Sequence, residues 1–554
     1  MSASSKKKLR KEQSATALTE KQRAELKEAK KLKAYSITFI SVMLVVVIVA
    51  VTVMAATGIN RTGIFQKNTI AAVVEGHELN TVEMTYYFKD AIAAAYSEWY
   101  NYYGNNTDFY VSWFYGLDVN KSLNRQQHSE GKSWADYFME TALENARSNY
   151  ALYDLAVKNG HTLTEDEQKT VDTQKEYLLL EAQFSGYSID RYLQLIYGFG
   201  ATEESYDQYT KISSIARSYY AHIYNELTYD EEAVRAYEEG KYNNYSSFTY
   251  GRYYLNYKNY LPGDSKEDKD YSAEQIAAAK AAALTDAQKL AQAKNEEELK
   301  AAILGLSINA ENPNASISTD KDILFSKLDS EYAEWLGDRS RNENDITYVE
   351  DTSTNMGEDD KEVTEGNGSY YVILFKSRND NLRLLANVRH LLVKFEGGTT
   401  DKDGNTVYPD EKKAEAKAEA EGYLKTWKEG DATEDSFAAL VKEKTDDTGS
   451  KESGGLFEDI TPASSYVENF LNWCIDENRK KGDTDVIETE YGYHVMYYVG
   501  DGEMSYRDYM IRNDMRNEDM KEWFDGVMEP ISASFKNLTF MNLSTTVSSA
   551  IAQG

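Results

Sequence analysis

An uncharged segment near the N-terminus most constrains how this chain can fold. Residues 34–60 contain no Asp, Glu, Lys, Arg or His, and their middle is almost entirely aliphatic. As a helix this segment would be about 40 Å long, enough to cross a bilayer. Residues 1–33 before it hold eleven Lys and Arg against four Asp and Glu, whereas the whole chain has a net charge of −31. The positive-inside rule therefore predicts a basic cytoplasmic tail over residues 1–33, a transmembrane helix over residues 34–59 and an extracytoplasmic bulk.

Two alternatives compete with a membrane anchor. A buried core helix of this length would be unusual. A cleaved signal peptide would normally have a shorter apolar stretch and a shorter charged leader. The acidic remainder excludes nucleic-acid binding through a broad basic surface. A single Cys, Cys474, excludes an internal disulfide framework and any Cys-based metal site, so we expect no metal and no cofactor.

The pattern over residues 68–244 predicts a helical module that opens with a short strand and turn. Apolar and Tyr positions recur at intervals of three and four residues, which is typical of amphipathic helices. The expected helices begin at Asn80 and then cover residues 132–158, 165–183, 188–197, 203–227 and 230–241. The segment offers no nucleophile–base pair. The Tyr stripes indicate either internal packing or a face that binds unfolded chains, because Tyr combines apolar area with a hydroxyl group.

Residues 245–380 and 384–501 present the same order of elements twice. The first expected set is a strand over 245–260, helices over 273–302 and 326–341, and a strand over 369–377. The second is a strand over 386–395, helices over 410–428, 434–444 and 467–480, and a strand over 492–499. Four residues keep identical offsets in both: Trp335, Asp338, Arg341 and Asp345 align with Trp473, Asp476, Arg479 and Asp483. These matches predict a tandem pair of related α+β domains.

Three motifs in the second unit carry a family resemblance. They are VRHLLVKF at 388–395, DSFAALVKEKTDDTGSKESGG at 435–455 and ETEYGYHVMYYVG at 488–500. Residues 384–501 resemble a parvulin, the PpiC-type peptidyl-prolyl isomerase domain. The whole chain resembles membrane-anchored extracytoplasmic foldases of the PrsA/SurA type, in which a helical chaperone module carries one or more parvulin domains. This resemblance implies an α+β multidomain fold with a transmembrane helix, an all-α chaperone module and two tandem parvulin-like domains.

The resemblance also implies a site. The implied catalytic residues are His390, Asp447, His494 and Thr489, and the implied proline pocket is Leu456, Tyr466 and Phe470. A lone His in a strand is more often a core residue, and Tyr466 and Phe470 are equally compatible with plain packing. The first unit lacks both His: Tyr253 or Tyr254 takes the place of the first and Tyr371 that of the second. We therefore expect a degenerate parvulin-like domain over 245–380.

These features predict a prolyl isomerase and chaperone at the outer face of the cell membrane, acting on unfolded or newly exported polypeptides with X–Pro bonds. A non-enzymatic holdase, or a scaffold in secretion or envelope assembly that uses the parvulin shell for binding, is the alternative. Residues 502–554 complete the chain with an amphipathic helix and a tail.

Overall fold

The computed structural model describes residues 4–8, 27, 31, 42–47, 62–263, 268–352, 366–400 and 406–551. Most of the transmembrane segment predicted over residues 34–59 lies outside these ranges. Within them, no helix is both long and apolar enough to cross a membrane. The chain divides into two compact units, residues 1–227 with 519–554, and residues 228–518.

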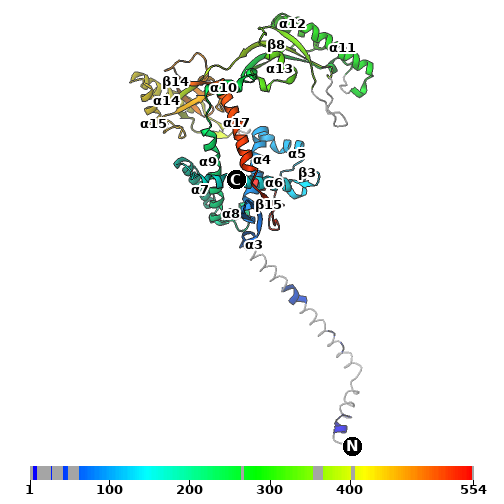
Figure 1. Ribbon diagram of the computed structural model, residues 1–554, viewed down its shortest axis with the longest axis vertical. Coiled ribbons are helices and arrows are strands. Elements are labelled where there is room, and N and C mark those ends of the chain that lie inside the picture. The colour runs from blue at the N-terminus through cyan, green and yellow to red at the C-terminus, as the bar shows by residue number, and fades with distance from the viewer. Residues whose placement is uncertain are drawn as a thin grey trace. The chain divides into compact units, whose positions relative to one another are not determined.

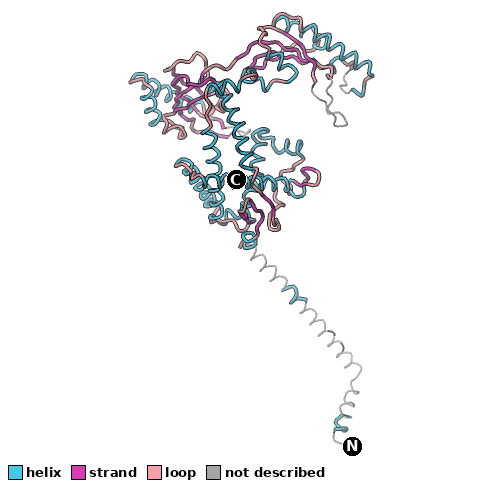
Figure 2. The backbone as a smooth tube through the Cα atoms, viewed as in Figure 1, coloured by secondary structure: helices cyan, strands magenta, loops and turns pink. Residues whose placement is uncertain are grey.

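Helices dominate the first unit (Figure 2). The longest are α4 (Thr81–Tyr103), α6 (Trp134–Lys158), α7 (Glu165–Phe184) and α9 (Glu203–Glu226), close to the predicted ranges. Side-chain caps explain where they begin, since Asn80, Ser133, Thr164 and Thr202 each accept hydrogen bonds from the first turn of the helix that follows. The shorter elements are α3 (Ile64–Asn68), α5 (Thr107–Tyr115), α8 (Ile189–Tyr197), α18 (Val547–Ile551), β3 (Gln127–Ser129) and β4 (Lys132–Ser133).

The C-terminal segment completes this unit. Strand β1 (Ile70–Val74) pairs on one side with β2 (His77–Asn80) and on the other with β15 (Ala533–Phe535), so the two ends of the chain share one sheet. Met541 and Val547 join the core formed by α4 and α6. Helix α17 (Tyr506–Met528) begins in the second unit and ends in the first. In the first unit its Trp523 and Phe524 pack beside Tyr219.

The second unit contains two four-stranded antiparallel sheets with the same strand order. Figure 1 labels one central strand of each sheet, β8 (Tyr370–Asn379) and β14 (Gly492–Ser505). The first sheet runs β6 (Ser318–Leu324), β5 (Ser247–Leu255), β8 (Tyr370–Asn379), β7 (Ile346–Glu350). The second runs β12 (Leu456–Ile460), β9 (Leu384–Lys394), β14 (Gly492–Ser505), β13 (Thr484–Thr489). The remaining elements are α10 (Glu231–Glu238), α11 (Ala273–Leu290), α12 (Glu296–Leu304), α13 (Ser330–Gly337), β10 (Thr399–Thr400), β11 (Thr406–Val407), α14 (Asp410–Glu429), α15 (Glu434–Lys444) and α16 (Glu468–Cys474). We call residues 245–380 the first repeat and residues 384–501 the second repeat.

The aligned residues play the same structural part in both repeats. Arg341 Nε donates to the Trp335 carbonyl at 3.2 Å, and Arg479 Nε to the Trp473 carbonyl at 3.3 Å. In each case the guanidinium also lies over the Trp ring, 4.6 Å and 4.3 Å from its centroid. The aligned residues therefore have a structural role. We call the contact of Arg341 with Trp335, and of Arg479 with Trp473, the Trp–Arg clasp.

The edge strands add a correspondence that the sequence did not reveal. Asp322 on β6 and Asp459 on β12 both have a left-handed backbone with φ of 52°, at an irregularity in the strand pairing. The backbone N–H of Asp322 donates to Thr249 Oγ1, and that of Asp459 donates to Asn387 Oδ1. Both bulges interrupt the pairing of an edge strand at equivalent positions of the two sheets.

Three helix predictions in the second unit were wrong in length. The helix expected over 326–341 is α13, which covers only Ser330–Gly337. The helix expected over 273–302 is two helices, α11 and α12, because Asn295 accepts a hydrogen bond from Glu298 N–H and starts a new helix. The helix expected over 467–480 ends at Cys474, because Asp476 accepts from Asn478 N–H and turns the chain back so that Arg479 reaches Trp473. The short strands β6, β7, β12 and β13 were not predicted.

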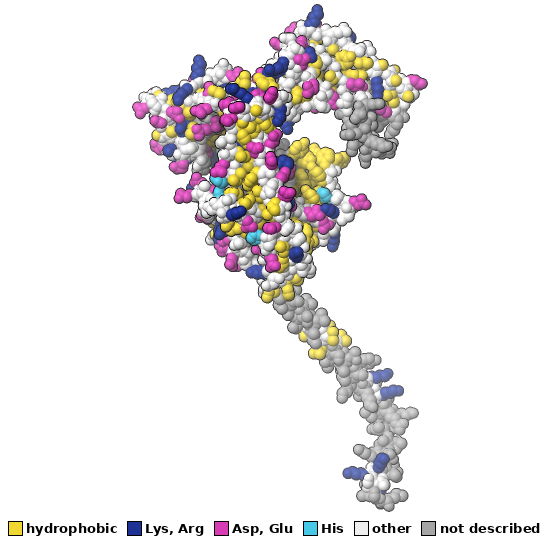
Figure 3. All heavy atoms as spheres, in the orientation of Figure 1, with side chains coloured by type: hydrophobic (Ala, Val, Ile, Leu, Met, Phe, Trp, Pro, Cys, Tyr) yellow, Lys and Arg dark blue, Asp and Glu magenta, His cyan; other side chains and the backbone are white. Residues whose placement is uncertain are grey.

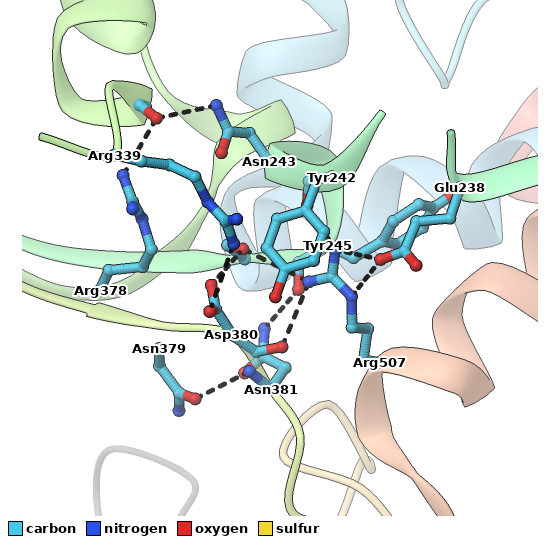
Figure 4. Close-up of polar contacts among 12 residues, drawn as sticks. Glu238, Tyr242, Asn243, Tyr245, Arg339, Arg378, Asn379, Asp380, Asn381 and Arg507 are labelled. Carbon is cyan, nitrogen blue, oxygen red and sulfur yellow. Dashed lines mark hydrogen bonds and ion pairs between the residues drawn. The ribbon is translucent and has the colours of Figure 1, made fainter. Parts of the chain in front are cut away.

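A buried arginine at the start of α17 links α10 and the segment after it to the end of the first repeat (Figure 4). Arg507 is 3% exposed and donates to the Glu238 carboxylate, the Tyr242 carbonyl at 2.6 Å and the Asp380 carbonyl at 3.2 Å. Its guanidinium also lies 3.6 Å from the centroid of the Tyr242 ring. Charge-assisted hydrogen bonds therefore hold the end of the first repeat against the start of α17.

Candidate active site

Two buried histidines meet on the central strands of the second repeat. In the register of β9 and β14, His390 lies opposite Met496 and His494 opposite Leu392, so the two imidazoles are diagonal neighbours on one face. Their Nδ1 atoms are 2.9 Å apart and their ring centroids 5.1 Å apart. They are 4% and 5% exposed. The structure thus brings together the two residues that the motifs singled out.

Hydrogen bonds extend this pair at both ends. Thr489 Oγ1 lies 2.8 Å from His494 Nε2, and Asp447 Oδ2 lies 3.0 Å from His390 Nε2. Ser450, which the sequence reasoning missed, donates to the same carboxylate oxygen and lies 3.3 Å from His390 Nε2. The sequence did offer one indication of this contact, because Ser450 follows Asp447 by only three residues in the same loop.

When both imidazoles are neutral, the available donors and acceptors fix the direction of each hydrogen bond in this row. An ionised carboxylate only accepts hydrogen bonds, so His390 Nε2–H donates to Asp447. His390 Nδ1 then accepts from His494 Nδ1–H, and His494 Nε2 accepts from the Thr489 hydroxyl. The four side chains therefore form one continuous polar line through an apolar region.

Burial and hydrogen bonding set the charge states of this line. Burial lowers the pKa of His494 to about 3, so this imidazole is neutral near neutral pH. The hydrogen bond from His390 holds the pKa of Asp447 well below its usual range, and the Ser450 hydroxyl acts in the same direction. Asp447 is therefore the fixed negative charge of the site.

Paired glycines let the Asp447 loop approach β9. Gly455 has φ of +71°, and a Cβ atom on it would lie 2.1 Å from the His390 carbonyl oxygen. The absent side chain allows His390 N–H to donate to the Gly455 carbonyl at 3.0 Å. The same loop is anchored by Thr445, whose hydroxyl accepts from Leu392 N–H.

Three aromatic rings form a wall over the histidines. Phe470 packs edge-on against both His390 and His494, with centroids 5.4 Å and 5.5 Å away. Phe457 contacts His390 at 5.0 Å, and Tyr466, which is 37% exposed, packs against both phenylalanines. This wall offers an apolar surface beside the polar line.

Leu456 does not join this wall. It lies opposite Arg389, whose side chain pairs with Glu434 on α15, and successive residues of a strand point to opposite faces. Phe457, one residue later, takes the position that we expected for Leu456. The alternation of side chains along β12 would have distinguished Phe457 from Leu456, but this strand was not predicted from the sequence.

The first repeat has different chemistry at the same positions. The registers of the two sheets place Tyr371 where His494 lies, as expected, but Arg252 where His390 lies. The expectation that Tyr253 or Tyr254 replaces the first His was therefore wrong, by one or two residues of register. Arg252 pairs with Asp320 at 3.3 Å, and Asp320 occupies the position of Phe457.

Outside the repeats, an exposed aromatic surface lies on α4 and α5 of the first unit. Tyr102, Phe109, Trp113 and Phe114 are between 61% and 82% exposed. Phe109 stacks on Trp113 and Phe114 stacks on Tyr110. Figure 3 shows hydrophobic side chains gathered in the area of α5. We call these residues and Tyr110 the aromatic patch. A surface of this kind usually marks a binding site.

Nothing in the described part of the chain forms a cluster of three or more His, Cys, Asp or Glu able to hold a metal ion. Burial raises the pKa of the Cys474 thiol to about 12, so this thiol is not a nucleophile.

Residues 372–499 match the family model of the PPIC-type PPIASE domain, and the chain therefore carries such a domain. The foldase protein PrsA of Clostridium botulinum is 37% identical over 112 residues, which are 20% of this chain and 25% of that protein. The chain thus spans about a quarter of the length of this curated relative. PrsA from Bacillus cereus has a solved structure with a TM-score of 0.17 and 21% identity, over 27% of this chain and 49% of that one. A SurA-like chaperone structure described for PEB4 and Cj1289 of Campylobacter jejuni covers 68% of this chain and 88% of that one, with a TM-score of 0.13 and 13% identity.

Proposed function

We propose that this chain is a peptidyl-prolyl cis-trans isomerase and chaperone that assists the folding of exported proteins. The observation that best supports isomerase activity is the hydrogen-bonded line of Asp447, His390, His494 and Thr489 beneath the aromatic wall. It lies inside the segment that matches the PPIC-type domain. No cofactor is needed, because the reaction makes and breaks no covalent bond.

The chemistry asks for two kinds of surface. Rotation about an X–Pro bond has a barrier of about 18–20 kcal/mol because the amide loses its resonance in the twisted state. The aromatic rings of Phe457, Tyr466 and Phe470 hold the proline ring. The two imidazoles and the charge of Asp447 present a fixed polar environment to the rotating carbonyl and so favour the twisted amide over the planar one.

We assign catalysis to the second repeat alone. Arg252, Asp320 and Tyr371 replace the histidines and Phe457 in the first repeat, and they offer an ion pair in place of a proline pocket. The first repeat is then a degenerate parvulin-like domain that serves binding or spacing.

The test is isomerisation of a proline tetrapeptide by the full-length protein. We expect a rate that rises linearly with protein concentration and disappears in the His390→Ala, His494→Ala double variant. A rate equal to the uncatalysed one, with folded protein, would leave a non-enzymatic holdase or a scaffold as the function.

The aromatic patch favours chaperone activity as a second function. Its large exposed rings match the apolar segments of an unfolded client. Trp113→Ser with Phe109→Ser should weaken suppression of client aggregation and leave tetrapeptide isomerisation unchanged. The matched control is Tyr177→Ser, since Tyr177 is 66% exposed but lies outside the patch. Equal effects of both variants would remove the patch from the proposal.

We place the bulk of the chain outside the cytoplasmic membrane, anchored by residues 34–59. The uncharged segment and the basic leader support this orientation. Protease added to intact protoplasts should digest residues from about 61 onward and leave a small membrane-bound N-terminal piece. Complete protection of the chain would contradict the orientation.

A further inference from the structure

A pocket of about 570 Å³ lies between the two repeats, within the second unit. Neither repeat forms it alone. Its apolar lining includes residues from β6, from the start of β9, from the end of β12 and from the segment that follows β12, among them Ile323, Leu324, Leu384, Ile460, Pro462 and Ala463. This volume is in the range of sites that bind small ligands or short peptide segments.

Two polar residues of the pocket lining, Asn381 and Arg383, already have hydrogen-bond partners. Asn381, drawn in Figure 4, donates its side-chain amide to the Tyr245 carbonyl and its backbone N–H to Asn379 Oδ1. Arg383 donates to the Asp476 carbonyl. The charged residues that line the pocket are two of each sign, Asp322 and Glu477 against Lys327 and Arg383, so the lining has no net charge. An apolar, uncharged group is therefore the chemistry that this pocket suits.

One short segment connects the pocket to the proposed active site. Pro462 and Ala463 line the pocket, and Tyr466, three residues after Ala463, belongs to the aromatic wall over His390. Strand β12 makes the same connection, since Phe457 contacts His390 and Ile460 lines the pocket. Three residues of extended chain span about 10 Å. A client bound at the histidines would therefore reach the pocket with a residue three to five positions from its proline.

We propose that the pocket between the repeats is a second subsite for the same client chain, which binds a large aliphatic side chain three to five residues away from the isomerised X–Pro bond. This inference rests on the proposed isomerase function. It assigns a task to the first repeat, which supplies Ile323 and Leu324 to the subsite although it lacks the histidines.

The experiment uses the full-length protein and peptides that share one proline core. Each peptide is extended by six residues on the N-terminal or the C-terminal side, with either Leu or Ser at positions three to five from the proline. We expect the Leu form of one series to have a KM roughly tenfold lower than its Ser form, from burial of an aliphatic side chain minus the ordering of the peptide. The unextended tetrapeptide should not distinguish the variants described next.

Leu384→Asp tests the pocket and Leu382→Asp is its matched control. Both leucines are substantially exposed, at 40% and 63%, but only Leu384 lines the pocket. Leu384→Asp should abolish the preference for Leu, and Leu382→Asp should keep it. Ala463→Trp, which fills the pocket from an exposed position, is the second variant should Leu384→Asp fail to fold.

The outcomes separate the two proposals. Turnover of the tetrapeptide without any preference for Leu in either series would overturn the subsite and leave the isomerase intact. A preference that survives both Leu384→Asp and Ala463→Trp would also overturn it, because the aliphatic residue would then bind elsewhere. Absence of tetrapeptide turnover would overturn the proposed function and the subsite with it.

Discussion

The two repeats share a frame and differ in the residues that fill one face of it. Both have the same strand order, the same Trp–Arg clasp and the same left-handed Asp on the edge strand. On the face toward α13 or α16, however, the first repeat places Arg252 against Asp320, whereas the second places His390 against Phe457.

This difference separates what the fold needs from what the chemistry needs. Features present in both repeats, such as Trp335 and Trp473, are required to build the sheet and turn the chain. Features present only in the second, such as the His390–His494 pair, are not needed to form the same frame. The comparison therefore selects candidate functional residues from two regions of one chain.

The largest expected effect comes from removing one histidine. His494→Ala should lower the isomerisation rate by about 10- to 1000-fold, or roughly 1.4–4 kcal/mol of transition-state stabilisation. Tyr371→Ala, at the equivalent position of the first repeat, should leave this rate nearly unchanged. Rates on a proline tetrapeptide measure both. If Tyr371→Ala lost activity and His494→Ala did not, with both variants folded, catalysis would belong to the first repeat and our assignment would be wrong.

A substitution at the loop glycine should act on stability. A Cβ atom on Gly455 would clash with the His390 carbonyl and demand a left-handed backbone, so Gly455→Ala should cost about 3 kcal/mol. Ser318 is the equivalent residue and already carries a side chain, whose hydroxyl donates to the Arg252 carbonyl at 2.8 Å. Ser318→Ala should cost about 1 kcal/mol or less. Urea unfolding of both variants tests the difference, and equal losses would contradict it.

The buried imidazole should make stability depend on pH. The unfolded chain binds a proton at His494 near pH 6.5, whereas the folded chain binds it only near pH 3. The contribution of this group is therefore complete above pH 6.5 and is lost as pH falls toward 3, with about 2 kcal/mol lost between pH 7 and pH 5. His494→Gln should remove this part of the slope, and Tyr371→Phe should retain it. Denaturant titrations at several pH values measure the slopes, and identical slopes in all three proteins would refute the neutral state of His494.

The smallest predicted effect concerns the carboxylate. Asp447→Asn keeps the shape but removes the charge that orients His390, and we expect kcat/KM to fall about tenfold. Asp351 is the buried acid of the first repeat and accepts from the Tyr254 hydroxyl. Asp351→Asn should leave kcat/KM unchanged. A normal kcat/KM in Asp447→Asn would show that the charge of Asp447 is not used in catalysis and that this residue only anchors its loop.

Local sequence patterns predicted α4, α6, α7, α8 and α9 of the first unit because their caps and periodicity are short-range signals, as at Ser188 and Thr202. They missed the short helix α5. They missed β6, β7, β12 and β13, which are only five to seven residues long and gain their stability from neighbouring strands. The break between α11 and α12 was hidden by uniform Ala, Lys and Glu composition.

For the candidate site, the family resemblance of the motifs implied His390, Asp447, His494 and Thr489, and the structure brings all four into one hydrogen-bonded line. Phe457, and not the expected Leu456, lies beside the histidines. Arg252, and not Tyr253 or Tyr254, is equivalent to His390. Both errors are shifts of one or two residues. A shift of one residue turns a side chain to the other face of a sheet, and only the strand register reveals it.

The sequence by itself determined the uncharged N-terminal segment, the tandem repeat and the identity of the polar residues, because charge, periodicity and spacing are properties of the chain. The tertiary structure decided which faces those residues occupy, that residues 533–535 complete the sheet of residues 70–80, and that a pocket forms between the repeats. These depend on contacts between segments far apart in sequence. The free energy of such contacts comes from burying side chains together, and no local pattern encodes it.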